Sequence, residues 1–320
     1  MEETHSKKYS KDLGDEIDFL ELFNILLAGK WIIVFITSFI IISGVIYSLL
    51  LPNIYKSESL LYPNDSSSSV FSRALQGYNG IAGLAGISLP SGVTEGNSVK
   101  AIQKISSLSF FENHILTNIY LPDLMAVKSW NSKINKLTYD ENIYDIKSNA
   151  WVRDYSHPKQ ATPSAQEAFN VFISEHLTLN EDKISGFITL SIKHQSPFVA
   201  RQWVELVVNE INGFYRQKDK LESERAVSYL NQKISVTSLS EVKYVLAQLL
   251  QEETKKLTLI EANQFYVFDY IDPPVVMEKK SEPRRSIIVI ISSIFGGFLS
   301  IFIVLIRHYA FRKKFNKSTI

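Results

Sequence analysis

The sequence of 320 residues contains no cysteine and only six histidines. The missing cysteine excludes disulfides, thiol catalysis and cysteine-ligated metal sites. The histidines show no zinc-binding spacing such as His-Glu-x-x-His, and a Gly-x-Ser-x-Gly nucleophile motif is absent. The sequence therefore predicts no metal, no cofactor and no nucleophilic catalytic site.

An excess of one charge is also lacking, since the formal net charge is +1 at pH 7. This balance gives no reason to expect nucleic-acid binding. The Ser/Gly-rich stretch from Ser66 to Gly96 lacks the Lys-Ser/Thr that closes a phosphate-binding loop, so we expect an ordinary flexible or packed loop. A glycosidase-like carboxylate pair could come from five acids, which we expect to be solvated instead: Asp140, Glu141, Asp145, Glu181 and Asp182.

Two long apolar runs, Trp31–Leu51 and Ile287–Ile306, contain no charged residue. Each has about the 20 residues that a transmembrane helix needs. Residues 17–27 are predicted to form a separate interfacial helix, because the charged residues Asp18 and Glu21 disfavour a longer first span. Lysine and arginine flank both ends of the chain, which predicts cytoplasmic termini. The first run is too long for a signal peptide and has no cleavage site after it.

These runs predict five segments along the chain: a cytoplasmic N-terminus with the interfacial helix (1–30), a first span (31–51), a periplasmic domain (52–286), a second span (287–306) and a cytoplasmic tail (307–320). The central segment is long enough for one sizeable domain or two small ones. The predicted fold class is thus an α+β membrane protein, with two transmembrane helices bracketing an α/β base and a long helical hairpin.

Short-range patterns in the central segment predict both strands and helices. Strands are expected at 54–62, at 265–271 and twice within 177–192, where Gly186 joins the two. A helix over 97–120 should break at Ser106-Ser107. Ser164 and Glu167 form a capping box before a helix that ends near residue 175. Residues 122–157 show no clear periodicity.

A long helix should begin at Ser196-Pro197, with serine as N-cap and proline at the first position, and continue to about Val236. Roughly 40 residues would span about 60 Å. The capping-box pattern Ser238–Glu241 should open a second helix. The two helices can pair as a hairpin over residues 197–262, rising from the base.

The second half of the long helix is charged between Arg216 and Arg225, and we expect it to be too polar for burial in one protomer. Two interpretations stay open. Neighbouring subunits could supply ion pairs to Arg216, Lys218, Glu222 and Arg225. Alternatively, the face is solvated and carries intrahelical pairs such as Lys218–Glu222.

Prolines and small residues mark the second span. Pro273, Pro274 and Pro283 predict a stiff, extended lead-in, because proline fixes φ and cannot donate a backbone hydrogen bond. Small residues let membrane helices approach closely, so they predict a subunit interface, unless glycine is simply common in such helices. The small residues are Gly44 and Ser48 in the first run and Ser292, Gly296, Gly297 and Ser300 in the second.

Several segments, taken in order, resemble the Wzz family, the chain length determinants or polysaccharide co-polymerases of lipopolysaccharide O-antigen. Met277 departs from the family pattern, which often has another proline there. The similar segments are Gly80–Gly86, Leu124–Arg153, Gly186–Pro197 with Ala200 and Trp203, Asn209–Asn212, Tyr229-Leu230 and Asp272–Arg285.

The resemblance implies a periplasmic α/β base, a helical protrusion and a ring-shaped homo-oligomer, often octameric, in the inner membrane. It further implies that the protein sets the modal length of O-antigen made on a lipid carrier by a Wzy-type polymerase, without catalysis. Two alternatives remain: a kinase-less co-polymerase for capsule or exopolysaccharide export, and a two-span periplasmic sensor. The 14 residues after Ile306 are too few for a kinase or signalling domain, so we expect neither on this tail.

Overall fold

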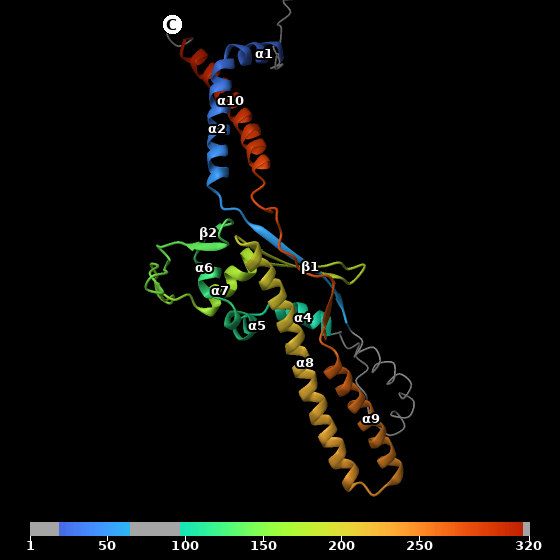
Figure 1. Cartoon of the computed structure of the whole chain (residues 1–320). Coiled ribbons are helices and arrows are strands. Elements are labelled where there is room, and N and C mark those ends of the chain that lie inside the picture. The colour runs from blue at the N-terminus through green and yellow to red at the C-terminus, as the bar shows by residue number, and fades with distance from the viewer. Residues whose placement is uncertain (1–18, 65–96, 316–320) are drawn as a thin grey trace, which may run out of the picture. The chain divides into compact units, whose positions relative to one another are not determined.

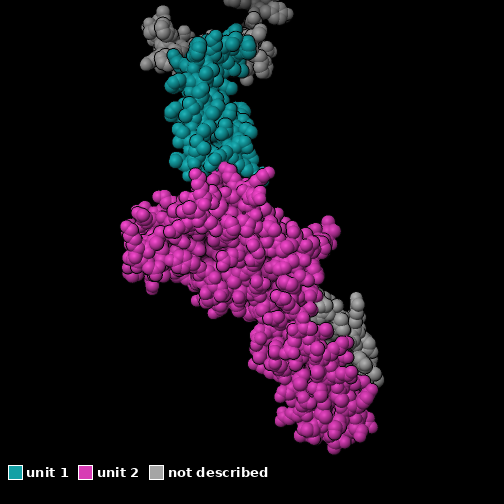
Figure 2. Space-filling model, in the orientation of Figure 1, with its two compact units in different colours: residues 1–51, 283–320 teal, residues 52–282 magenta. Residues whose placement is uncertain are grey.

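The structure is a computed structural model and describes residues 19–64 and 97–315. It divides into two compact units, residues 1–51 with 283–320 and residues 52–282 (Figure 2). The Ser/Gly-rich stretch 66–96, including the segment Gly80–Gly86, lies outside the described residues. Each unit is taken separately below.

The first unit contains three helices, α1 (Phe19–Ala28), α2 (Lys30–Leu50) and α10 (Arg285–Phe315). Helices α2 and α10 have mean hydropathies of 2.5 and 2.7 and are long enough to cross a membrane. Both helices carry exposed apolar side chains, among them Phe35 and Phe298, which are 75% and 71% exposed. Both apolar helices were predicted, but α10 continues beyond the expected end at residue 306.

Helix α1 is separate from α2, as the acids near its start predicted. The two helices meet at Gly29, which closes α1 by donating its N–H to Ile25 O at 3.0 Å. A Cβ at this position would lie 2.5 Å from Val304 Cγ1 of α10. Glycine therefore allows the chain to turn against α10 where any side chain would clash.

The second unit is built on a four-stranded antiparallel sheet in the order β6-β7-β1-β8 (Figure 1). Inner strand β1 pairs with β7 from Tyr55↔His194 to Leu61↔Ile188, and with β8 on its other side. Gly186, with φ of 71°, lies in the β6–β7 connection. All four strands were predicted: β1 (Tyr55–Pro63), β6 (Leu177–Glu181), β7 (Ile188–His194) and β8 (Phe268–Asp272).

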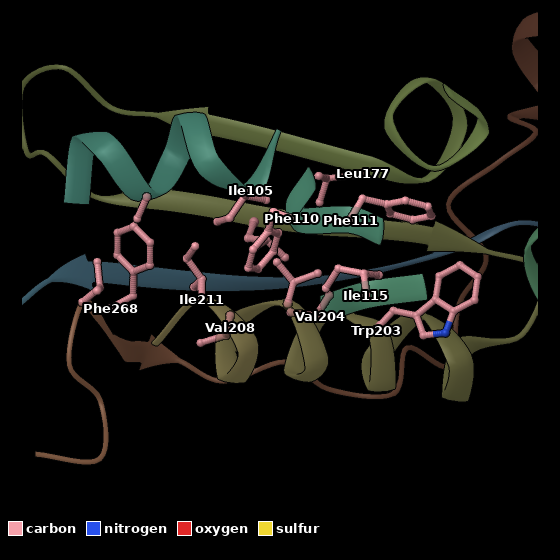
Figure 3. Close-up of a cluster of buried hydrophobic side chains, with 14 of the residues drawn as sticks. Ile105, Phe110, Phe111, Ile115, Leu177, Trp203, Val204, Val208, Ile211 and Phe268 are labelled. Carbon is pink, nitrogen blue, oxygen red and sulfur yellow. The ribbon is translucent and has the colours of Figure 1, made fainter. Parts of the chain in front are cut away.

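One hydrophobic core fills the space between the sheet and its helices. In Figure 3, Val204 and Ile211 of α8 converge with Phe110 and Ile115 from the preceding helical segment. That segment breaks at Ser107, as predicted, where Ser107 Oγ caps Phe110 N at 3.3 Å. Its pieces are α4 (Asn97–Ile105), α5 (Leu108–Phe110), the π-helix η1 (Phe111–Ile115) and the 3₁₀ turn η2 (Leu116–Asn118).

Helix α7 (Ala165–Val171) opens with the predicted capping box between Ser164 and Glu167. It continues into a second π-helix, η3 (Phe172–His176), which no sequence pattern indicated. The two π-helices place the rings of Phe111 and Phe172 5.1 Å apart in the core.

The segment 122–157, which showed no periodicity, folds into short elements. They are helix α6 (Leu121–Met125) and two small hairpins, each of two strands. The strands are β2 (Val127–Asn131), β3 (Lys136–Tyr139), β4 (Tyr144–Asp145) and β5 (Ala150–Trp151).

Helix α8 (Pro197–Val236) has 40 residues and confirms the predicted length. It pairs with α9 (Ser240–Ala262), and the two run side by side in Figure 1. The capping box at Ser238 was wrong, because α9 begins after Leu239 without a side-chain cap. Thr237 and Leu239 are both extended, so the serine belongs to the short linker that reverses the chain.

A buried histidine anchors the start of α8. The side chain of Ser196 forms no cap, contrary to the prediction. Its backbone N–H instead donates to His194 Nδ1 at 2.9 Å. The proton of the neutral ring therefore sits on Nε2, which donates to Asp123 O at 2.9 Å. The ring packs 5.1 Å from Trp203 and 5.7 Å from His176.

A buried asparagine joins α8 to the last strand. Asn212 is 3% exposed. Its Oδ1 accepts from Val267 N at 2.7 Å and Phe268 N at 2.9 Å, and its Nδ2 donates to Phe268 O at 2.9 Å. The amide thus satisfies backbone groups of the β8 edge that the sheet does not reach.

Replacing Asn212 by alanine should leave these three backbone groups of β8 unpaired and destabilise the protein by about 2–4 kcal/mol. Denaturant unfolding of the full chain in detergent, followed by tryptophan fluorescence, measures the loss. Asn209→Ala, on the exposed face of the same helix, is the matched control. Equal losses in both variants would contradict the role assigned to Asn212.

Stability should also fall as the medium becomes acidic. Burial lowers the pKa of His194 from 6.5 to about 4, so folding favours the neutral ring. Between these values the unfolded chain binds a proton that the folded chain does not, and stability declines as pH falls from about 6.5 towards 4. The loss is on the order of 3 kcal/mol. Thermal unfolding measured at a series of pH values should show this loss of stability. The dependence on pH should be weaker in His194→Gln, whereas the control His157→Gln, at an exposed site, should keep the dependence of the wild type.

Candidate functional site

The segment after β8, residues 273–282, is held against β1 by side chains. Ser57 Oγ donates to Val275 O and Ser59 Oγ donates to Asp272 O, each at 2.9 Å. Both serines are 1% exposed. Pro273 and Pro274 have no N–H to continue a ladder, and the serine hydroxyls of β1 hold this segment instead by donating to its carbonyl oxygens.

The far end of this lead-in is fastened a second time. Ile54 N donates to Glu282 O at 2.9 Å, and Ser281 N donates to Ile54 O at 2.8 Å. The carboxylate of Glu282 pairs with Lys193 Nζ of β7 at 2.6 Å. The sequence predicted stiffness from proline alone. These contacts show that residues 273–282 are also tied to the sheet near both ends, and Pro283 follows the second tie.

The predicted small-residue face packs α10 against α2 of the same chain. A Cβ on Gly44 would lie 2.3 Å from Ser292 Oγ, and one on Gly296 would lie 3.2 Å from Ile40 Cβ. Ser300 is fully buried and its hydroxyl accepts from Thr37 Oγ1 at 3.3 Å. This face therefore closes the pair within one chain, where we had predicted a contact between subunits. Gly297 lies away from it, with nothing within 4 Å of its added Cβ.

The charged part of α8 is partly buried within a single chain, which corrects our expectation. Asp219 is 9% exposed and accepts from Tyr266 Oη at 2.7 Å and Asn97 Nδ2 at 2.8 Å. Ser223 is 1% exposed. Lys220 Nζ reaches Glu261 of α9 at 2.8 Å. Neighbouring elements thus satisfy Asp219 and Lys220, so these two residues do not require a second subunit, whereas Ser223 Oγ has no hydrogen-bond partner among the described residues.

The four charged residues that we singled out are more open to solvent than Asp219 and Ser223. Lys218, Glu222 and Arg225 are exposed and Arg216 is half-buried. Lys218 Nζ and Glu222 Oε1 are 4.0 Å apart, at the limit of an ion pair. The intrahelical pairing is thus present, while a partner for the outer face would have to come from another molecule.

Three of the candidate acids accept hydrogen bonds from residues two or three positions later in the chain and so stabilise local turns. Asp140 accepts from Asn142 N at 3.0 Å, Asp145 from Ser148 Oγ at 2.6 Å and Asp182 from Ile184 N at 2.9 Å. The Ser148 hydroxyl lowers the pKa of Asp145, and the Ile184 N–H lowers the pKa of Asp182. A glycosidase general acid needs a raised pKa, so these carboxylates are suited to turn formation.

Two apolar helices that bracket an antiparallel α/β unit with a helical hairpin define the architectural class of this chain. A family model described as "Chain length determinant protein", the Wzz domain, matches residues 15–115. This match confirms the resemblance to the Wzz family found in the sequence. A second model, "G-rich domain on putative tyrosine kinase", matches residues 230–309.

Among solved structures, a full-length bacterial polysaccharide co-polymerase is 13% identical, covers 92% of this chain and 99% of its own, and gives a TM-score of 0.40. A fragment of WzzB, the polysaccharide co-polymerase from Salmonella Typhimurium, is 11% identical, covers 72% and 100%, and scores 0.32. At these scores the similarities add no argument of their own. No curated protein matches the chain.

The helix pair gives a direct test, since a chain without cysteine allows clean crosslinking. Thr37→Cys combined with Ser300→Cys should form a disulfide within one chain, because the two native hydroxyls are 3.3 Å apart. Adding Gly296→Leu should reduce the crosslink strongly, because leucine would push α2 away. Gly297→Leu is the matched control and should leave the yield unchanged.

Gel electrophoresis without reductant reads the result. A band of monomer mobility that reverts on reduction supports the intrachain packing. A covalent dimer as the main product, or equal crosslinking in the Gly296 and Gly297 variants, would show that the small-residue face does not join α2 to α10 of one chain.

Proposed function

We propose that this protein sets the modal chain length of lipopolysaccharide O-antigen made by a Wzy-type polymerase. The single observation that carries the proposal is the chain length determinant match over residues 15–115, which runs from before α1 through β1 to η1. The protein acts on the length distribution as a scaffold, without making or breaking glycosidic bonds. Its cargo in this role is the lipid-linked polysaccharide.

In this proposal α2 and α10 cross the bacterial inner membrane, with residues 52–282 in the periplasm and both termini in the cytoplasm. The lengths and hydropathies of the two helices support the crossing. Lys30 before the first span and Arg307, Arg312 and Lys313 after the second support the orientation, since positive residues favour the cytoplasmic side.

We further propose that the protein works as a homo-oligomeric ring, octameric as in the family resemblance. The hairpin supports assembly, because Val242, Val245 and Leu249 form an exposed apolar stripe on α9, each more than 40% exposed. An exposed stripe of this kind is typical of a protein contact. Lys218 and Arg225, which are exposed on α8, could add ion pairs between copies.

The second family match favours one alternative, a co-polymerase for capsule or exopolysaccharide export, because its description names a domain carried by tyrosine kinases. The mechanical role of the scaffold would be the same and the polymer would differ. The two possibilities separate in one experiment: delete the gene, and compare O-antigen ladders and capsule size distributions before and after complementation.

Loss of the modal O-antigen length with an unchanged capsule supports the proposal. An unchanged O-antigen ladder with altered capsule or exopolysaccharide supports the alternative. A strain whose polymers all keep their lengths would overturn both, and a sensor function would then be the hypothesis to pursue.

The lead-in should matter for length control if it couples the scaffold to α10. Pro283→Ala relaxes φ after the second tie, and Ser57→Ala with Ser59→Ala removes two hydrogen bonds of the first. Each variant should broaden or shift the modal length while the membrane level of the protein is unchanged. Ser235→Ala, an exposed serine of α8, is the control. Unaltered ladders in both lead-in variants would mean that the segment merely ends the folded unit.

A further inference from the structure

A cavity of about 270 Å³ opens beside the tie between Ile54 and Glu282. Its walls come from the start of β1, the end of β7, α6 and the α7–η3 segment. Its polar lining consists of Asp123, Glu175, His176, Lys193, His194 and Gln195, and its apolar lining includes Val127 and Val171. The role proposed above makes no use of this site.

The first unused polar group is on His176. Its Nδ1 lies 2.6 Å from the carbonyl oxygen of Lys193, which can only accept. The ring proton therefore sits on Nδ1, and Nε2 is left as an acceptor. Burial lowers the pKa of this histidine, which keeps the ring neutral. Across the described part of the chain no hydrogen bond reaches Nε2.

The second is on Gln195. Its Nε2 donates to Val127 O at 3.2 Å, which fixes the amide. Its Oε1 is buried and, among the described residues, has no hydrogen-bond partner. Leaving a buried acceptor unpaired costs about 1–3 kcal/mol, and a donor that reached this oxygen from the cavity would recover that cost.

Carboxylates add further acceptors. Asp123 is held by the hydroxyl of Tyr139, which donates to its Oδ1, and its second oxygen is available. Glu175 is exposed at the cavity and brings solvent contact. The lining thus offers several acceptors beside one cationic donor, Lys193. Hydroxyl groups suit this set, because each can donate to the acceptors and accept from the lysine.

We propose that this cavity binds one sugar unit of the polysaccharide whose length the protein controls. Its volume is near the lower end of the range for small-molecule sites, which suits a single ring. His176 Nε2, Gln195 Oε1 and the carboxylates accept from the sugar hydroxyls, while Val127 and Val171 contact its apolar face. The identity of the ligand rests on the proposed function, whereas the presence of a hydroxyl-binding site rests on the cavity itself.

Binding at this site would be felt by the lead-in. Lys193 lines the cavity and also forms the 2.6 Å ion pair with Glu282. Ile54 lines it too and carries both backbone hydrogen bonds of the second tie. A sugar hydroxyl that attracts Lys193 competes with Glu282, so an occupied cavity loosens the segment that leads along the chain to α10.

The test measures binding directly on the full-length protein in nanodiscs. The probes are delipidated oligosaccharides from the O-antigen and, separately, from the capsule of the host cells, followed by saturation-transfer NMR and calorimetry. Wild-type protein should bind one of them saturably. Gln195→Met should weaken binding about tenfold, the effect of losing roughly 1.4 kcal/mol. Val171→Trp should abolish binding by filling the cavity.

The control is Val152→Trp, because Val152 is exposed and does not line the cavity. Thermal unfolding confirms that each variant is folded. If wild-type protein binds neither oligosaccharide, or if the cavity-filled variant binds as the control does, the cavity holds water only and the inference is wrong. Normal length control in a protein that binds neither probe would leave the proposed function intact. Saturable binding by the protein, together with polymer lengths that do not change when its gene is deleted, would support the cavity as a binding site and overturn the proposed function.

Discussion

An inner strand must be hydrogen-bonded along both edges, and this requirement organises the larger unit. Strand β1 is paired with β7 on one side, but its other partner, β8, ends at Asp272 before two prolines. The N–H groups that would continue the ladder do not exist. Buried serines at 57 and 59 hold the segment instead by donating to its carbonyl oxygens, and Ile54 resumes backbone pairing at Glu282. The first and last segments of this unit are thereby hydrogen-bonded to each other along β1.

Buried polar residues let one unbroken helix serve two environments. Helix α8 contributes Val204 and Ile211 to the core and then pairs with α9 as a hairpin. Asn212 and Asp219 lie at the passage between these environments, and both are fully engaged with β8, Tyr266 or Asn97. Unsatisfied polar groups there would be costly, so these contacts fix the rotation of the helix as well as its stability.

Periodicity revealed the regular elements, whereas features that depend on partners stayed hidden. The 40-residue helix, the four strands and the Ser164 capping box each have a local signal. The π-helices do not, because one inserted residue leaves the apolar pattern almost intact. Ser238 is not the cap of α9, because a capping-box pattern indicates only that a helix can start nearby. The exact first residue depends on how the chain reverses between α8 and α9. Likewise, glycines at 44 and 296 indicate a tight contact without naming the helix that fills it. The cavity joins residues from positions 54 to 195, which no window of sequence brings together.

The distribution of exposed surface constrains how copies could assemble. The closest-packed face of the apolar helices is already occupied within one chain, since Gly44, Gly296 and Ser300 all meet the other helix. Across the described residues, the hairpin instead leaves apolar side chains such as Val236, Leu239 and Val245 uncovered. Burying apolar area in water is favourable, whereas lipid already solvates the outer faces of membrane helices. We therefore expect the main energy of any ring to come from the hairpins, with α2 and α10 acting as a pre-assembled pair.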